Sequence, residues 1–95
     1  MYNYCQLIGT LKEVKEITST KVIITLGVQR EFKNADGTFD CDYIPVECTD
    51  FLCDFVKENY SIGDCVAVKC RLSKVTEHDT LRIIAVRFIL MKGGE

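Results

Sequence analysis

The side chains that could do chemistry in this chain are one histidine, His78, and six cysteines, at positions 5, 41, 48, 53, 65 and 70. Thiolates and imidazoles are the usual ligands of structural zinc, but no two of these cysteines have the CxxC spacing, and His78 lies in an acidic turn. A nucleophilic Cys48 or Cys53 would need a nearby base, and His78 is far along the chain. We therefore expect no metal site, no cofactor and no enzymatic activity.

The cysteines are better interpreted as small core residues than as a disulfide framework. The chain shows no N-terminal apolar run with a cleavage site, and segments so rich in Val, Ile and Leu do not need disulfides to fold. We therefore expect reduced thiols and a cytoplasmic protein. No stretch approaches the roughly 20 apolar residues that span a bilayer, which argues against a membrane protein.

Composition limits both the size of the protein and its partners. At 95 residues and 47% hydrophobic composition, the chain is long enough for one domain and too short for two. Its 12 Lys and Arg against 14 Asp and Glu give a formal net charge of -2, without the basic excess typical of duplex-binding domains. A local stripe of cations suffices for a single strand, because stacking on aromatic rings contributes about 1–3 kcal/mol per base.

The pattern of apolar residues predicts five strands and one helix. The strands are expected over residues 2–13, 22–32, 39–48, 65–76 and 81–91, with a polar connection over residues 12–21 and a tight turn at 77–79. Gly9 indicates a bulge or bend in the first strand, and Pro45, which cannot donate to a ladder, indicates an edge or bulge in the third. Asn34, Asp36 and Gly37 mark a hairpin turn between the second and third strands.

The expected helix lies in TDFLCDFVKENY, residues 49–60, where Thr49 or Asp50 can cap the free N-terminal amides. Its apolar stripe should plug one end of a barrel and consists of Phe51, Leu52, Phe55 and Val56. Five strands with a single short helix between the third and fourth is the layout of an all-β, five-stranded OB-fold barrel. We expect one OB-fold domain over residues 1–91 and a short C-terminal stub at 92–95.

The exposed sheet face of such a barrel commonly holds single-stranded nucleic acid, so the cations on the strands are of interest. Six of them could follow a phosphate backbone and release counterions: Arg30, Lys33, Lys69, Arg71, Lys74 and Arg82. Arg71 and Lys74 are favoured, because odd and even positions of one strand lie on opposite faces and at least one should face the groove. The alternative is that each is a solvated charge on an exposed face.

Several segments taken together resemble bacterial single-stranded DNA-binding proteins. NYCQLIGTL is similar to their first strand, GVQREF to their second, FDCDYIPVECTDFLCDFV to their third strand and helix, and IGDCVAVKCRLSK to their fourth. The similarity extends to about Leu90. It implies sequence-independent binding of single-stranded DNA, in replication, recombination or repair.

The resemblance also implies which side chains contact the bases. Aromatic residues on the second and third strands of the family stack on bases, and Phe32 and Tyr43 occupy the corresponding positions here. The alternative for both rings is packing under the hairpin. Two further aromatic positions of the family carry no ring in this chain, at Thr49 and within residues 72–76.

A second function remains open beside DNA binding. Cellular members of the family usually carry a long extension with an acidic, partner-recruiting tip, whereas this chain ends in MKGGE and resembles tail-less types such as primosomal replication protein N and short phage or mobile-element versions. We therefore expect no acidic tail for recruiting replication enzymes. The alternative function is a protein-protein adaptor, primosome-like or a mobile-element accessory protein, that keeps the barrel as a scaffold.

Self-association is expected for two reasons. The first strand is long and apolar, and an unprotected edge of that kind pairs with other chains. The resemblance points the same way, because family members dimerise through this strand and often form tetramers. We expect a dimer or tetramer with Tyr2, Tyr4 and Gln6 at the contact.

Overall fold

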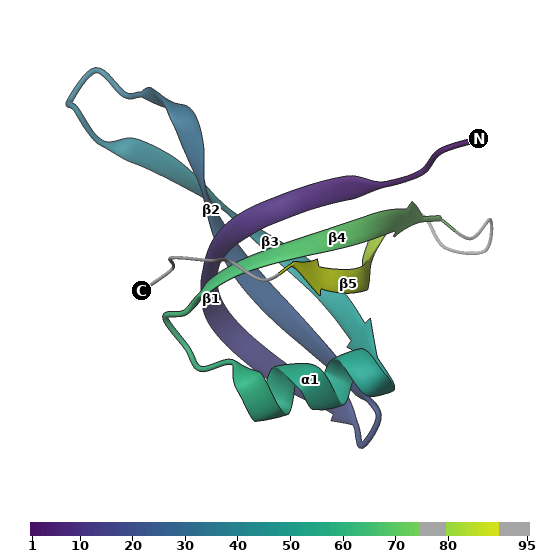
Figure 1. Ribbon diagram of the computed structural model, residues 1–95. Coiled ribbons are helices and arrows are strands. Elements are labelled where there is room, and N and C mark those ends of the chain that lie inside the picture. The colour runs from purple at the N-terminus through teal and green to yellow at the C-terminus, as the bar shows by residue number, and fades with distance from the viewer. Residues whose placement is uncertain (75–79, 90–95) are drawn as a thin grey trace.

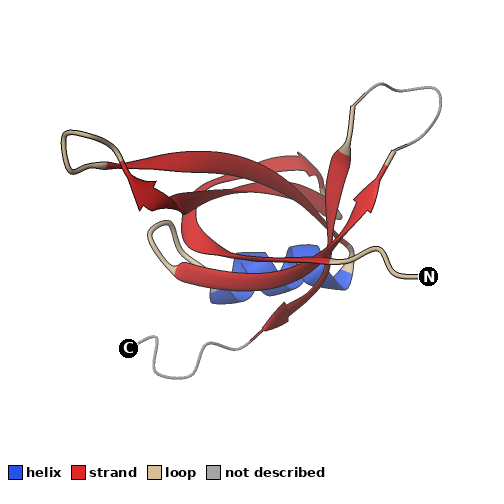
Figure 2. Cartoon of the chain, turned by 90° about the horizontal axis from the view of Figure 1, so that it is seen from above, coloured by secondary structure: helices blue, strands red, loops and turns tan. Residues whose placement is uncertain are grey.

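Five strands and one helix follow one another in the order β1 (Cys5–Thr18), β2 (Lys21–Lys33), β3 (Phe39–Thr49), α1 (Phe51–Asn59), β4 (Cys65–Ser73) and β5 (Arg82–Ile89). The structure is a computed structural model that describes residues 1–74 and 80–89. The strands form a closed barrel in the order β1-β2-β3-β5-β4, and α1 lies across one end of it (Figures 1 and 2). This is the five-stranded OB-fold barrel predicted from the order of elements.

Strand β1 is long enough to pair with two different strands, β4 and β2, and so closes the barrel. Its first half pairs with β4, from Cys5 opposite Cys70 to Thr10 opposite Cys65. Its second half pairs with β2, from Thr10 onward to Thr18. The predicted polar connection after residue 12 is therefore wrong. These residues are polar because this half of the strand is solvent-exposed, not because it is a loop.

Close packing of two glycines lets β1 curve over β2. A Cβ atom on Gly9 would lie 2.6 Å from the carbonyl oxygen of Gly27, so only glycine fits at this position. The β-bulge in β1 lies further along the strand, where the register with β2 shifts between Leu11 and Glu13. Gly9 thus permits a close approach between strands, and the bulge predicted at Gly9 occurs about two residues later.

Strand β3 is well paired on one side and nearly open on the other. It follows β2 along its length, with Pro45 opposite Thr25, but within the described residues it pairs with β5 at one position, Glu47 opposite Ile84. Pro45 is exposed. Its missing N–H is therefore tolerated, as expected for a proline on an edge.

The core is a single cluster of aliphatic residues and cysteines inside the barrel. Cys48, Cys53 and Cys70 are completely buried within it, Cys5 and Cys41 are partly buried, and Cys65 is exposed. All six are free thiols. Burial is the main reason that the pKa values of Cys48 and Cys70 are raised to about 12. These thiols are unreactive core residues, as the sequence indicated for most of the cysteines.

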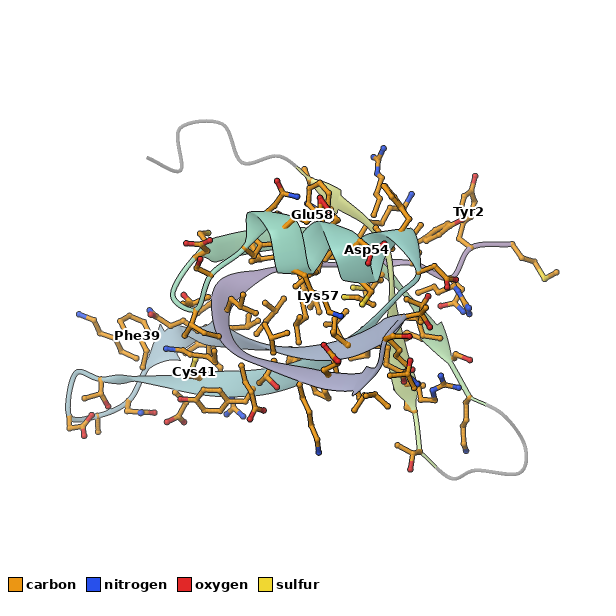
Figure 3. All side chains as sticks on the ribbon, turned by 90° about the horizontal axis from the view of Figure 1, so that it is seen from below. Tyr2, Phe39, Cys41, Asp54, Lys57 and Glu58 are labelled. Atoms are coloured by element: carbon orange, nitrogen blue, oxygen red, sulfur yellow. The ribbon has the colours of Figure 1, made fainter. Side chains whose placement is uncertain are left out.

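Helix α1 covers the end of the barrel with three residues of the predicted stripe, Leu52, Phe55 and Val56, together with Cys53, but without Phe51. Cys53 and Val56 are buried, whereas Phe51 is 73% exposed and is not part of the plug. Phe55 stacks on Phe88 of β5, with ring centroids 5.4 Å apart, and contacts Tyr60 edge-on at 5.8 Å. The exposed residues of the helix include Asp54, Lys57 and Glu58 (Figure 3).

The start of the helix does not use the predicted side-chain cap. Asp50 occupies the N-cap position with φ 54°, and its side chain makes no capping hydrogen bond. Its backbone N–H instead donates to the Thr20 carbonyl at 2.7 Å, tying the helix start to the β1–β2 turn. Lys57 makes a second link, an ion pair of 2.9 Å with Glu16 on the exposed half of β1.

Some predictions lie outside the described residues. They are the ends of the fourth and fifth strands at 76 and 91, the turn at 77–79 that contains His78, and the stub at 92–95. Within residues 1–74 and 80–89, no group of three or more His, Cys, Asp or Glu side chains is arranged to hold a metal ion. In the same residues, no helix has the length and apolar character needed to cross a membrane.

Candidate nucleic-acid interface

The β2–β3 hairpin projects beyond the barrel and ends in a well-ordered turn (Figures 1 and 2). The N–H of Asn34 donates to the Thr38 carbonyl at 2.7 Å, and Gly37 adopts φ 89°, a conformation that favours glycine. A carboxylate oxygen of Asp36 accepts from both the backbone N–H and the hydroxyl of Thr38, at 3.0 and 2.7 Å. The predicted turn residues therefore fix the hairpin by local hydrogen bonds.

Both rings predicted to stack on bases are exposed on this hairpin. Phe32 is 82% exposed and Tyr43 is 63% exposed, so neither packs under the hairpin. Tyr43 lies opposite Gly27, which has no side chain to cover the ring. Two open rings on a projecting arm meet the geometric requirement for base stacking, and their contact with nucleic acid stays a prediction.

The structure adds two residues that sequence reasoning missed. Phe39, Cys41 and Tyr43 alternate onto one face of β3, and Phe39 is 38% exposed there (Figure 3). A Cβ atom on Gly27 would lie 2.8 Å from Cε of Lys12, so the Lys12 side chain crosses the strands beside Tyr43. Period-two spacing from Tyr43 would have found Phe39, whereas Lys12 could not be placed without the strand register.

Lys33 joins the same face. It pairs opposite Phe39 at the base of the turn, after the register between β2 and β3 has shifted beyond Gln29. Phe32 lies in this shifted stretch, so regular alternation does not place its ring on the face of Tyr43. We define the hairpin face as Lys12, Lys33, Phe39 and Tyr43, with Phe32 beside it.

Arg30 is neutralised within the hairpin. Its guanidinium donates three hydrogen bonds to the Asp42 carboxylate, at 2.8, 3.1 and 3.3 Å, and one nitrogen lies 3.8 Å from Asp40. The hydrogen bond to Asp42 raises the pKa of Arg30 and lowers the pKa of Asp42. Arg30 was predicted to contact phosphate, and any such contact must compete with two carboxylates.

Arg82 is held in a tighter ion pair near the barrel wall. It donates to both carboxylate oxygens of Glu47, at 2.6 and 2.7 Å, and Lys21 lies 3.0 Å from one of them. The Glu47 side chain is only 12% exposed, and these partners, Arg82 first, lower its pKa to about 2. Because Glu47 also marks the β3–β5 pairing, Arg82 helps to close the barrel.

The other predicted cations are not neutralised by neighbours that the structure describes. Lys33, Lys69, Arg71 and Lys74 form no ion pair within residues 1–74 and 80–89. Arg71 is exposed on the outer face of β4, because Val66, Val68 and Cys70 of that strand are buried. Lys74 follows the end of β4 at Ser73, so the argument from opposite faces of one strand does not apply to it.

The N-terminal segment leads away from the barrel on the side opposite the hairpin (Figures 1 and 3). Tyr2 is 94% exposed, Tyr4 is 56% exposed, and Gln6 is also exposed. Asn3 fastens this segment to β4, because its side-chain amide donates to the Leu72 carbonyl at 2.6 Å and accepts from the Leu72 N–H at 3.0 Å. A contact between copies through these residues stays a prediction.

The barrel topology and the projecting hairpin define an OB-fold, and solved structures of this fold resemble the chain throughout its length. A small single-stranded DNA-binding protein from Mycoplasma pneumoniae aligns over 97% of this chain and 97% of its own, with a TM-score of 0.72 and 17% identity. A mitochondrial single-stranded DNA-binding protein from S. cerevisiae aligns over 100% of both chains, with a TM-score of 0.72 and 20% identity.

A small single-stranded DNA-binding protein from Streptomyces coelicolor gives a TM-score of 0.62 and 16% identity, over 93% of this chain and 92% of its own. No family model and no curated protein matches the sequence. At these identities the likeness establishes the fold. The proteins concerned are of the same class that the sequence segments resemble.

Proposed function

We propose that this protein binds single-stranded DNA without sequence preference, in replication, recombination or repair, and does so without a cofactor. The observation that carries the proposal is the pair of exposed rings, Phe32 and Tyr43, on the projecting hairpin of an OB-fold barrel. Solved structures with the same fold are single-stranded DNA-binding proteins, which supports the choice of ligand.

Stacking on the hairpin face would supply most of the affinity. Each stacked base contributes about 1–3 kcal/mol, and Phe39 offers a third, partly exposed ring further along the same face of β3 as Tyr43. Lys33, Lys69, Arg71 and Lys74 would contact phosphates, because no described carboxylate neutralises them. Arg30 and Arg82 would contribute less, since both are paired with carboxylates.

The experiment is a titration of dye-labelled oligo(dT) followed by fluorescence anisotropy at low and moderate salt. An external dye is needed because the chain has no tryptophan. The Phe32→Ala, Tyr43→Ala double variant should bind between about 30-fold and 10⁴-fold more weakly, from the loss of two stacked bases. Phe51→Ala is the matched control, because this ring is equally open but lies on α1.

The outcomes separate the two functions. Tight binding that weakens with salt, is not competed by duplex and is lost in the double variant would support the proposal. Unchanged affinity in the double variant would contradict the stacking site. If the wild-type protein does not bind oligo(dT) even at low salt, the proposal of DNA binding is wrong, and the adaptor function is the one that remains.

We also propose that the protein acts in the cytoplasm and self-associates as a dimer or tetramer. The six free thiols, three of which are buried, are consistent with a reducing compartment. Within the described strands, β1 pairs with β4 from Cys5 and reaches β2 only at Thr10, so the edge before Thr10 is open on one side. Two copies would pair along this edge, with Tyr2, Tyr4 and Gln6 at or beside the contact. A monomeric mass in light scattering at micromolar concentration would contradict it.

A further inference from the structure

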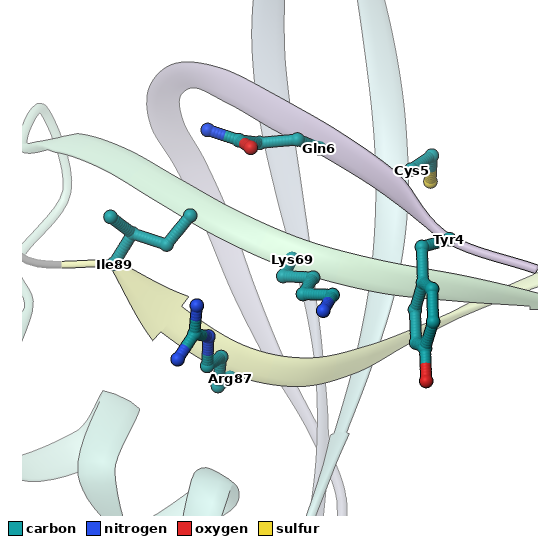
Figure 4. Close-up of a pocket in the computed structure, with 6 residues that line it drawn as sticks. All are labelled: Tyr4, Cys5, Gln6, Lys69, Arg87 and Ile89. Atoms are coloured by element: carbon teal, nitrogen blue, oxygen red, sulfur yellow. The ribbon is translucent and has the colours of Figure 1, made fainter.

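A pocket lies on the outer face of β1, β4 and β5, which are not the strands of the hairpin. Its volume is about 350 Å³, and it is lined by Tyr4, Cys5, Gln6, Lys69, Arg87 and Ile89 (Figure 4). Small-molecule sites typically occupy roughly 300–1,000 Å³, so a single nucleotide is within the range that it can hold. The residues that line it include one ring, one amide and two cations.

The strand register brings the polar residues of the pocket into one row. Gln6 of β1 lies opposite Lys69 of β4, which lies opposite Arg87 of β5. A register shift between Lys69 and Cys70 leaves Val86 unpaired and places Arg87, rather than Val86, beside Lys69. Bulges often re-aim a side chain in this way. Here the shift sets two cations side by side on an exposed face.

Tyr4 is held over this row. The ammonium of Lys69 lies 4.1 Å from the centre of its ring, a cation–π contact (Figure 4). Asn3, the preceding residue, is fixed by its two hydrogen bonds to Leu72. More than half of the Tyr4 surface remains exposed. The ring is therefore oriented before any ligand arrives, which lowers the entropic cost of binding.

The charge of the pocket is uncompensated by any carboxylate that the structure describes. Lys69 and Arg87 form no ion pair within residues 1–74 and 80–89, in contrast to Arg30 and Arg82. An exposed ring beside two free cations is complementary to an aromatic group that carries an anion. A nucleotide has this chemistry, because its base can stack on a ring while its phosphate contacts Lys or Arg.

We propose that this pocket is a second nucleotide subsite of the protein, separate from the hairpin face. One base stacks on Tyr4, its phosphate lies between Lys69 and Arg87, and Gln6 contacts the base or sugar edge. The inference rests on the proposed function, because the nucleotide belongs to the bound single strand. It gives the Tyr4 side chain a role in DNA binding that the predicted contact between copies does not require, since that contact can use the backbone edge of β1.

The test compares Tyr4→Ala with Tyr2→Ala in the same oligo(dT) titration. Tyr2 is a matched control, since it is an exposed tyrosine two residues away that does not line the pocket. Tyr4→Ala should weaken binding by about 5- to 150-fold, the loss of one stacked base, and Tyr2→Ala should not. Tyr4→Phe keeps the ring and should bind like the wild type.

A second arm tests the cations and a third maps the contact directly. The Lys69→Gln, Arg87→Gln double variant should make the slope of log affinity against log salt less negative by about 1.4, since each phosphate contact on a single strand contributes about -0.7. Photocrosslinking of the wild-type protein to an iodouracil-substituted strand should place a crosslink on Tyr4 itself, assigned by fragmentation because Tyr2 lies on the same tryptic peptide. This readout needs no variant to fold.

Each failure has a distinct meaning. If the wild type does not bind oligo(dT), the proposed function fails. If the wild type binds and the Phe32→Ala, Tyr43→Ala variant does not, but Tyr4→Ala binds like Tyr2→Ala, only the subsite is overturned. A smaller mass of Tyr4→Ala in light scattering with unchanged affinity would assign the ring to a contact between copies. Binding of free dTMP at this pocket, without an effect of Tyr4→Ala on the strand, would assign it to a free nucleotide and also overturn the subsite.

Discussion

Glu47 of β3 connects three strands through charged side chains. Its carboxylate accepts two hydrogen bonds from Arg82 of β5 and forms an ion pair with Lys21 of β2. Its folded pKa of about 2 lies below the ordinary value of 4.5. A lowered carboxyl pKa contributes stability above the unfolded value, and that contribution is lost as the pH falls through the folded value. We expect the free energy of unfolding to decrease between about pH 5 and pH 2.

Replacing this carboxylate tests the ion pair. Glu47→Gln should lower the free energy of unfolding at pH 7 by roughly 1–3 kcal/mol and should flatten its decrease below pH 5. Urea denaturation at pH 7, 4 and 3 measures both effects. Asp42→Asn is the control, because its pair with Arg30 is about half exposed and solvent-exposed ion pairs contribute little to stability. Equal losses in the two variants would contradict the special role of Glu47.

The thiols should differ sharply in reactivity. Cys65 is exposed, whereas burial holds the pKa values of Cys48 and Cys70 near 12. Because the thiolate is the reactive form, Ellman's reagent at pH 8 should modify Cys65 rapidly and the buried thiols only on unfolding. Cys65→Ser should remove the fast phase. Rapid modification of Cys48 or Cys70 in the native protein would show that the barrel is more open than described.

The sequence was enough to select individual candidate residues, but it was not enough to predict which residues pair with one another. Phe32 and Tyr43 could be selected from the resemblance, and both are exposed as stacking requires. The partner of Arg82 could not be selected, because Glu47 is 35 residues away and only the strand register brings the two together. The subsite at Tyr4 depends likewise on a register shift that no local pattern indicates.

At the scale of elements, helix α1 carries one phenylalanine that packs against other rings, Phe55, and one that is exposed, Phe51. Phe55→Ala should lower the free energy of unfolding by about 2–4 kcal/mol, because it removes the contacts with Tyr60 and Phe88. Phe51→Ala should change it by less than about 0.5 kcal/mol, because its ring is 73% exposed. Chemical denaturation of both variants measures the difference. Similar losses would mean that Phe51 also packs on the barrel.

The approach of β1 to β2 should depend on Gly9. Gly9→Ala places a methyl group 2.6 Å from a backbone oxygen, and we expect a loss of roughly 1–3 kcal/mol in thermal or urea unfolding. Gly27→Ala meets the far end of the flexible Lys12 side chain at 2.8 Å, which can move aside. Its loss should be below about 1 kcal/mol. A larger loss for Gly27→Ala would contradict this order.

The existence and order of all elements followed from the sequence, whereas several local features did not, among them the second half of β1 and the part of the helix that packs on the barrel. The second half of β1 was missed because its residues are exposed on a solvated strand, where polar composition resembles a loop. The helix stripe was misassigned at Phe51 because spacing alone cannot tell which residue of an apolar run faces the barrel.

At the scale of the whole molecule, the distribution of charge matters more than the net value of -2. Five cations that no described carboxylate neutralises are proposed to contact phosphates: Lys33, Lys69, Arg71, Lys74 and, in the proposed subsite, Arg87. They predict a slope of log affinity for oligo(dT) against log salt of about -3.5. Arg71→Gln should make this slope less negative by about 0.7, whereas Arg30→Gln should leave it nearly unchanged. Titrations at four or five salt concentrations measure the slopes. Equal changes would show that Arg30 leaves Asp42 when DNA binds.

The junction of β3 and β5 is also where we expect the barrel to open locally with the least energy. The two strands pair at one position within the described residues, and the Glu47–Arg82 ion pair spans the same place. Local opening needs the least energy where the fewest backbone hydrogen bonds must break. Amide protons around Ile84 should therefore exchange with deuterium through opening of this seam, well before the protons of β2, which is paired on both sides. Acidification that protonates Glu47 should speed the seam openings first, relative to global unfolding.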